Sequence, residues 1–293
     1  MGALGLGLGL DRVRRPRAGY DFTGDALPAG VALTRATPGW ATGADGRLVL
    51  AGVDAARIEH QGGARRGLLV EPAADNLVTL STGFDAPQWS ADAAWGGSVP
   101  VVTPAAAPGP DGASPAARLD FVRGDGFSRL FAAVAVSVPG PHCFSVWLRA
   151  VVPGPAIALR LDGVAGPTLV LDAVWRRFSV SASTGAAAAC QLILWNAIDG
   201  APATASVFAW GMQLERGTAP SSPVVTNGAP ATRAADRLTL DAAPLGLGEN
   251  GSARLRYRFD DGASALRVAA ISQGRITVPD DLPGTVLAAV EPA

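Results

Sequence analysis

The segment "LFAAVAVSVPGPHCFSVWL", residues 130–148, decides the fold class because it holds two apolar runs separated by Pro139, Gly140 and Pro141. Neither run is long enough to cross a bilayer as a helix, so we expect no membrane insertion. The runs extend to "RLFAAVAVSV" and "HCFSVWLRAV", in which side chains alternate with the period of two that indicates a β-strand. The proline and glycine residues between them predict a turn.

Similar segments flank this pair and predict a two-sheet sandwich over residues 79–216. About eight such strands occur at the spacing that is typical of sandwiches and jelly rolls. The 36 glycines and 23 prolines break the chain too often for long helices, which makes the predicted fold class all-β. The other predicted strands are "ARLDFV", "AIALRLDG", "TLVLDA", "RRFSVSAS", "CQLILWNA" and "ASVFAWGMQLE".

Four further segments surround the predicted sandwich. Residues 20–78 contain short alternating pieces and predict a small β-rich connector domain. Residues 217–236 are rich in proline, serine and threonine and predict an extended linker. Residues 237–293 predict a small C-terminal β-domain, and residues 1–19, which alternate glycine with leucine before turning basic, predict an N-terminal anchoring arm.

Charge and cysteine content exclude several classes of protein. The formal net charge is -1 and only 17% of the residues are charged, so no broad positive field is available for nucleic acid. The first arginines follow the initial apolar stretch, whereas a secretory signal carries them in front. Cys143 and Cys190 are the only cysteines, and we expect two buried free thiols rather than a disulfide.

The sequence offers little material for catalysis, so we predict no catalytic residues and no enzyme. Its two histidines, His60 and His142, fall in different predicted units. The adjacent pairs Asp260–Asp261 and Asp280–Asp281 fit turns, because neighbours on an extended chain point to opposite faces. No nucleophile or metal motif occurs. Carboxylates that the fold brings together from distant strands remain the alternative.

The tryptophans are the best functional signal in the sequence. Those within apolar strands, Trp147, Trp175 and Trp210, fit packing. Trp89, Trp95 and Trp195 instead stand in loop-like segments or at a strand end, the last beside Asn196 and Asp199. Indole rings stack on the C–H faces of sugars, and amides and carboxylates bind the hydroxyls, so these five residues are candidate carbohydrate contacts. The alternative is that Trp89 and Trp95 close one end of the sandwich.

The segment "RGLLVEPAADNL", residues 66–77, places Glu71 before Pro72 between apolar flanks. With four other segments it resembles a family of tailed-bacteriophage structural proteins, the tail-fibre, tail-spike and head-spike subunits that carry a jelly roll similar to carbohydrate-binding modules. The resemblance covers about residues 20–236, although Asp75 stands where the family usually has threonine. The other segments are "LTRAT" (33–37), "DGRLVLAG" (45–52), "ARIEH" (56–60) and "MQLERGTAPSSPVVTNGAPATRAAD" (212–236).

The resemblance implies a joint at Glu71, whose carboxylate would accept backbone or arginine hydrogen bonds where the connector meets the sandwich. It also implies that "QLE" closes the last sandwich strand. Jelly rolls of this type often hold a structural calcium ion, yet the sequence has no compact acidic loop, so no cofactor and no metal site are predicted. The glycine-rich start lacks the lysine of a phosphate loop.

The implied function is that of a virion structural subunit in a tail fibre or head spike, or in a phage-derived particle such as a gene transfer agent. It would assemble in the host cytoplasm as a homo-oligomer and act as a non-catalytic adhesin for host attachment through bacterial surface polysaccharide. Its arm would bind other virion proteins through Leu6, Leu8, Leu10, Arg14, Arg15 and Arg17. The rival functions are a capsule-depolymerising glycosidase spike and an architectural spacer that binds only virion proteins; a disordered start is the alternative to the arm.

Overall fold

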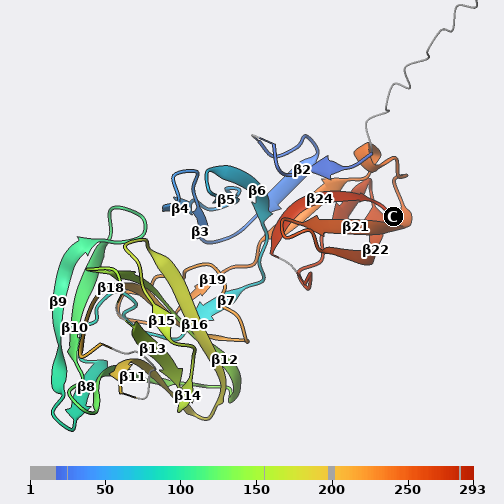
Figure 1. Cartoon of the computed structure of the whole chain (residues 1–293). Helices are drawn as coiled ribbons and strands as arrows, with labels where there is room; N and C mark the ends of the chain where they lie inside the picture. The colour runs from blue at the N-terminus through green and yellow to red at the C-terminus, as the bar shows by residue number, and fades with distance from the viewer. Residues whose placement is uncertain (1–17, 25, 155, 197–201, 284) are drawn as a thin grey trace, which may run out of the picture.

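The computed structural model describes residues 18–24, 26–154, 156–196, 202–283 and 285–293, and nearly all of their regular structure is β-strand. Figure 1 shows a sandwich on one side and a second β-body on the other. The predicted all-β class is therefore confirmed. One short 3₁₀ helix, η1 (Ala243–Leu245), occurs in these ranges, and none of their helices is long and apolar enough to cross a membrane.

Two antiparallel sheets form the sandwich. The five-stranded sheet has the order β16 (Arg176–Thr184), β12 (Gly140–Ala150), β18 (Thr204–Arg216), β10 (Pro115–Val122) and β9 (Ser98–Pro108). The six-stranded sheet has the order β14 (Val164–Ala165), β13 (Ala156–Leu161), β17 (Ala187–Trp195), β11 (Phe127–Ala135) and β8 (Trp89–Ala94), with β15 (Leu169–Val170) also paired to β13.

Side chains in residues 130–148 point alternately into the core and to the outer faces of the two sheets. Along β12, Phe144, Val146 and Leu148 are fully buried between the sheets, where they meet the inward side chains of β11. Trp147 and Arg149 alternate with them and lie on the opposite face of the sheet, half-buried. The same core encloses Cys190, and both cysteines are buried free thiols, as predicted.

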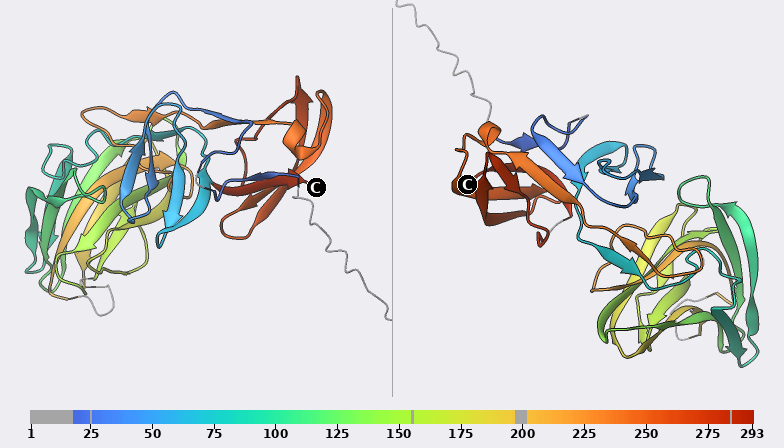
Figure 2. Two further views of the ribbon diagram at one scale, coloured as in Figure 1. Left: turned by 90° about the horizontal axis from the view of Figure 1, so that it is seen from above. Right: turned by 180° about the vertical axis from the view of Figure 1, so that it is seen from behind.

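The second body is a nine-stranded sheet that combines the two ends of the described chain. Its order is β2 (Val31–Thr34), β20 (Arg237–Asp241), β23 (Arg275–Thr277), β22 (Ser264–Ser272), β21 (Gly251–Phe259), β24 (Val286–Pro292), β6 (Ala64–Leu69) and β5 (Ile58–Gln61), with β1 (Tyr20–Asp21) paired to β24. Figure 2 shows blue and red strands side by side in this body.

This sheet corrects the predicted division into a connector at 20–78 and a separate C-terminal domain at 237–293. Pairing between β2 and β20 and between β6 and β24 joins the two segments in one sheet with one apolar core. Alternation identifies each strand but does not specify its partner, because the backbone hydrogen bonds that join strands are the same for all sequences. A distant partner is therefore not visible in the pattern.

Two short pairs connect the bodies. The hairpin of β3 (Gly39–Thr42) and β4 (Leu48–Ala51) lies against the sandwich, where Leu48 N donates to Pro110 O at 3.1 Å. At the same contact the Trp40 and Trp210 rings meet edge to face, with centroids 6.0 Å apart. The second pair, β7 (Ala74–Asn76) with β19 (Ala231–Arg233), joins the two chain segments that run between the bodies.

A buried ionic cluster lies where these segments meet; it comprises Arg35, Arg57, Glu71, Arg233 and Asp236. Arg57 Nη1 donates to Glu71 Oε2 at 2.6 Å and its Nη2 donates to Asp236. Arg35 Nη1 donates to Asp236 Oδ1 at 2.9 Å, and Arg233 Nη2 lies 3.4 Å from Glu71 Oε2. All five residues are at most 5% exposed, so each charge depends on its partners in place of water.

The cluster also binds the proline-rich linker. Ser222 N donates to Glu71 Oε1 at 2.8 Å, and Arg57 Nη1 donates to the Ser222 hydroxyl at 2.6 Å. One residue earlier, Ser221 N donates to Glu215 Oε1 at 2.9 Å at the end of β18. The expected arginine and backbone hydrogen bonds to Glu71 are confirmed, and β18 ends at Arg216, directly after the "QLE" element.

We predict that Glu71→Gln lowers the free energy of unfolding by about 3 kcal/mol, because it leaves the buried Arg57 and Arg233 with one carboxylate fewer. Urea unfolding followed by circular dichroism measures this. The exposed Glu249→Gln is the matched control and should stay within about 0.5 kcal/mol of the parent. A loss for Glu71→Gln no larger than that of the control would contradict the role of the cluster.

We predict that the stability of the parent protein and that of Glu71→Gln respond differently to acid. Burial alone would raise the pKa of Glu71, but Arg233 and Arg57 outweigh it and hold the pKa below the ordinary 4.5. The stability that this ionised carboxylate contributes is therefore fully present above pH 4.5 and is lost as the pH falls through the folded-state value. Glu71→Gln should remove that part of the acid dependence.

Candidate functional site

Three aromatic side chains cross the outer face of the six-stranded sheet in one line; we call Trp95, Phe127 and Trp195 the aromatic row. Phe127 at the start of β11 pairs in register with Trp195 of β17 on one side and with Ala94 of β8 on the other. Trp95 follows Ala94 directly, and its ring meets Phe127 edge to face at a centroid distance of 6.2 Å. Trp95 is 72% exposed, so the row includes an indole that is open to solvent.

Tight backbone packing holds Trp95 in place. Its φ of 50° is left-handed, which is unfavourable for a bulky residue and costs about 1–3 kcal/mol. Asp125 N donates to the Trp95 carbonyl at 3.0 Å, which binds the turn after β8 to the turn before β11. A Cβ on Gly124 would lie 2.3 Å from the Gly96 carbonyl carbon, and a Cβ on Gly126 would lie 2.7 Å from the Trp95 ring. The two turns approach this closely only because both positions are glycine.

Arginines lie beside the row and give the face a mixed character. The Arg160 guanidinium stacks over the Trp195 ring at 5.0 Å, and Arg129 stacks over Phe127 at 5.3 Å. Arg129 is neutralised by a bidentate ion pair, in which its Nε donates to Asp92 Oδ1 at 2.8 Å. Arg160 Nη2 donates to Gly163 O at 3.0 Å, and no carboxylate among the described residues pairs with it. The face therefore combines ring surfaces with directional polar groups.

The structure excludes Trp89 as a carbohydrate contact and gives Asn196 a structural role. Trp89 is only 9% exposed and stacks on Phe84 at 5.1 Å within the sandwich core, so it cannot bind a polymer outside the sandwich. This corresponds to the packing alternative for that residue. Asn196 uses its amide to donate to Asp125 O at 2.6 Å and so supports the turn before β11, which in turn donates to the Trp95 carbonyl. Asp199 lies outside the described residues, as do the arm residues Leu6, Leu8, Leu10, Arg14, Arg15 and Arg17.

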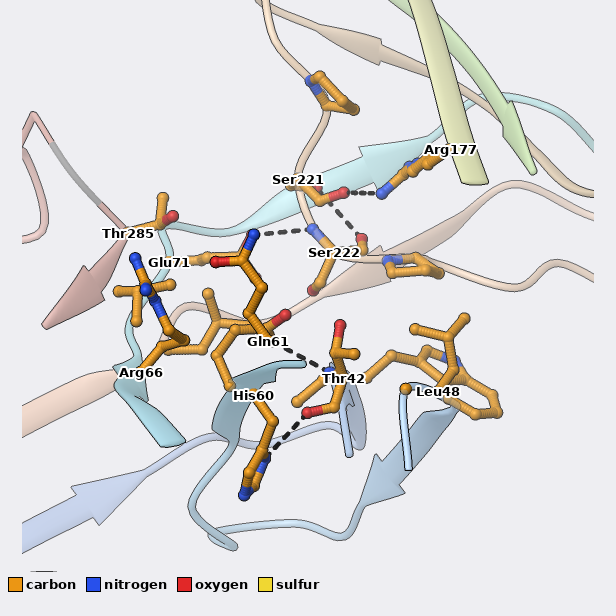
Figure 3. Close-up of a pocket in the computed structure, with 18 of the residues that line it drawn as sticks. Thr42, Leu48, His60, Gln61, Arg66, Glu71, Arg177, Ser221, Ser222 and Thr285 are labelled. Atoms are coloured by element: carbon orange, nitrogen blue, oxygen red, sulfur yellow. Dashed lines mark hydrogen bonds between the residues drawn. The ribbon is translucent and has the colours of Figure 1, made fainter. Parts of the chain in front are cut away.

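Sequence reasoning missed Phe127, although an aromatic residue at the first position of a strand that follows a glycine-rich turn was a visible signal. It also missed a cavity of about 610 Å³ between the sandwich and the second body, which we call the junction pocket. Trp147 lines it from β12, Trp175 from the segment directly before β16 and Trp40 from β3. His60, Gln61, Ser221 and Arg177 also line the pocket, and Figure 3 shows Ser221 beside Arg177 and Gln61 beside His60.

The carboxylates that line the junction pocket are each engaged by a donor. Glu71 belongs to the ionic cluster, and its lowered pKa keeps it ionised near neutral pH, which does not suit a general acid. Glu59 Oε2 accepts a hydrogen bond from Thr42 N at 3.0 Å, and Asp260 Oδ2 accepts one from Arg66 Nε at 3.2 Å. These contacts give the three carboxylates positions in the fold.

The two histidines stand apart. His60 lines the junction pocket, with Nδ1 in contact with the carbonyl oxygens of Thr42 and Ile58. His142 lines a different cavity of about 500 Å³, and its Nδ1 contacts Gly140 O and the Thr184 hydroxyl. Across the described part of the chain, no group of three or more His, Cys, Asp or Glu side chains could hold a metal ion.

Comparison with known proteins identifies no family. No family model matches the chain, and no curated protein matches it. Among solved structures, the chain is similar over 48% of its length to 99% of a family 61 carbohydrate-binding module in complex with β-1,4-galactotriose, at 14% identity and a TM-score of 0.36. It is similar over 50% of its length to 98% of a family 11 carbohydrate-binding module from Clostridium thermocellum, at 8% identity and a TM-score of 0.35.

A tailspike domain is also similar. The enzymatically active domain of tailspike protein 4 from bacteriophage CBA120 shares 12% identity with a TM-score of 0.35 over 47% of this chain. The match spans only 21% of that tailspike chain. Similarities at these identities and TM-scores do not indicate a function. The function of this chain is inferred from its own residues.

We predict that Gly126→Ala displaces Trp95, because the added methyl group would lie 2.4 Å from the Ala94 carbonyl oxygen and 2.7 Å from the Trp95 ring. The indole N–H signal of Trp95 in a ¹H–¹⁵N spectrum, assigned by its loss in Trp95→Phe, should move. Gly248→Ala is the control, since a Cβ there meets nothing within 4 Å. An unmoved Trp95 signal would show that glycine packing does not position the ring.

Proposed function

We propose that the protein is a non-catalytic structural subunit of a phage or phage-like particle and that its aromatic row attaches the particle to bacterial surface polysaccharide. The observation that carries this proposal is the exposure of Trp95. A bulky ring at 72% exposure is held in a left-handed backbone conformation by two glycine-dependent turns. Strain kept at an exposed position supports a binding role, because a ring that is 72% exposed contributes little to packing.

The chemistry of the row supports a saccharide ligand. The Trp95 and Trp195 rings offer apolar surfaces for the C–H faces of sugar rings, and Phe127 lies between them. Arg129 on β11 and Arg160 on the nearby strand β13 offer guanidinium groups for hydroxyl oxygens, and the buried Gln191 of β17 accepts a hydrogen bond from Arg129. An oligosaccharide fits this arrangement, because each of its sugar rings has an apolar C–H face and polar hydroxyl groups.

The resemblance of five sequence segments to phage structural proteins supports the placement in a particle. The residues that carry it, among them Arg35, Arg57, Glu71 and Asp236, meet in the buried ionic cluster. A homo-oligomer would repeat the row, so that weak sites add up to firm attachment by raising the effective concentration of each site. The particle surface and the host polysaccharide are the proposed partners.

We predict that Trp95→Ala and Trp195→Ala each weaken binding to capsular polysaccharide at least tenfold, about 1.4 kcal/mol, because each removes a stacking surface. Trp95→Ala should leave thermal stability nearly unchanged, since its ring is mostly in solvent. Binding of the purified protein to encapsulated and capsule-free cells of the same strain measures the effect.

Val268→Ala is the matched control, because Val268 is also 72% exposed but lies on the second body. Equal binding by the control and by both tryptophan variants would exclude the row as the attachment site. Equal binding to capsule-free cells would favour the architectural spacer. Reducing ends released from capsule during incubation would favour the depolymerase.

A further inference from the structure

Tryptophan side chains form one wall of the junction pocket, and no other side chain covers them completely. Trp147 lies on the outer face of the five-stranded sheet, Trp175 directly precedes strand β16 of that sheet, and Trp40 comes from the hairpin that packs beside them. All three side chains are only half-buried, whereas Trp210 beneath them is fully buried. The indole N–H of Trp147 is buried and has no hydrogen-bond partner among the described residues.

The opposite wall is polar and offers both donors and acceptors. His60 Nδ1 lies 3.1 Å from the Thr42 carbonyl oxygen and 3.2 Å from that of Ile58, so Nδ1 serves as a donor to these two acceptors and Nε2 is left for a ligand. Gln61 is exposed beside it, and the Ser221 and Ser222 segment forms the adjoining edge (Figure 3).

The charges around the pocket argue against an ionic ligand. Arg66 is paired with Asp260, and Glu71 is paired with Arg57. Arg177 donates to Ser145 Oγ at 2.9 Å and to the Ser221 carbonyl. The charged side chains are thus engaged within the protein, and the groups that remain for a ligand are neutral donors, neutral acceptors and indole surfaces.

We propose that the junction pocket is a second saccharide site that binds a neutral oligosaccharide. Its volume of about 610 Å³ lies within the range of small-molecule sites. It is built on the outer face of the five-stranded sheet, whereas the aromatic row lies on the outer face of the six-stranded sheet. Two sites on opposite sides of one sandwich let a single subunit contact two polymer segments, and the pocket ligand touches both bodies.

The test uses the full-length chain labelled with ¹⁵N and four neutral probes: cellotetraose, xylotetraose, mannotetraose and β-1,4-galactotetraose. Indole N–H signals report the two sites separately, because Trp40, Trp147 and Trp175 belong to the pocket and Trp95 and Trp195 belong to the row. We expect at least one probe to shift the pocket signals. Trp175→Ala should weaken that binding at least tenfold and Trp147→Phe about threefold, with the row signals unaffected.

Gln61→Ala, an exposed substitution that does not threaten folding, should weaken pocket binding as well, and Trp95→Ala should leave it unchanged. The proposal is overturned if no probe shifts the pocket signals, or if the three pocket variants bind with parental affinity. Shifts of the Trp95 and Trp195 signals alone would contradict the second site and would agree with saccharide binding by the aromatic row. Shifts of the pocket signals alone would support this site and count against the row.

Discussion

The buried pairing of Arg57 with Glu71 and Asp236 is the constraint on which the arrangement of this protein depends. Taking charged groups out of water is unfavourable unless each one meets an opposite charge in good geometry. Asp236 lies 165 or more positions along the chain from Arg35, Arg57 and Glu71, and its Oδ2 accepts a hydrogen bond from Glu71 N at 2.9 Å. The cluster can therefore form only when the segments that hold Arg35 and Arg57, Glu71 and Asp236 have all reached their native positions.

The position of the cluster explains why the sandwich and the second body form a defined junction. Ser222 binds the cluster, and its neighbour Ser221 binds Glu215 at the end of the sandwich strand β18. The hairpin that carries Trp40 packs on the sandwich beside Trp210. The walls of the junction pocket thus depend on the same contacts that hold the bodies, while the aromatic row depends only on local turns within the sandwich.

Period-two alternation predicted most strands of the sandwich, because one face of each strand must enter a core and this constraint is local, but it missed β8 and β9. It did not predict that β2 and β6 pair with β20 and β24, since the choice of partner depends on the whole chain. The sequence pattern put Trp89 and Trp95 in one loop-like segment, but Trp89–Ala94 form strand β8, and the Trp89 ring stacks on Phe84 in the core. Exposure of an aromatic ring follows from its neighbours in space. The quoted motifs did mark Arg35, Arg57 and Glu71, and the structure supplies the reason in their shared cluster.

The most direct test of the central claim measures the distance between the two bodies. Spin labels on Val170→Cys and Val268→Cys, both at sites of 72% exposure, report it by double electron–electron resonance. The native thiols are buried, and burial raises the pKa of Cys143 to about 11, so they should resist labelling. A single narrow distance distribution that broadens in Asp236→Asn is the predicted result. Equal widths with and without the Asp236 carboxylate would contradict the claim that the cluster fixes the junction.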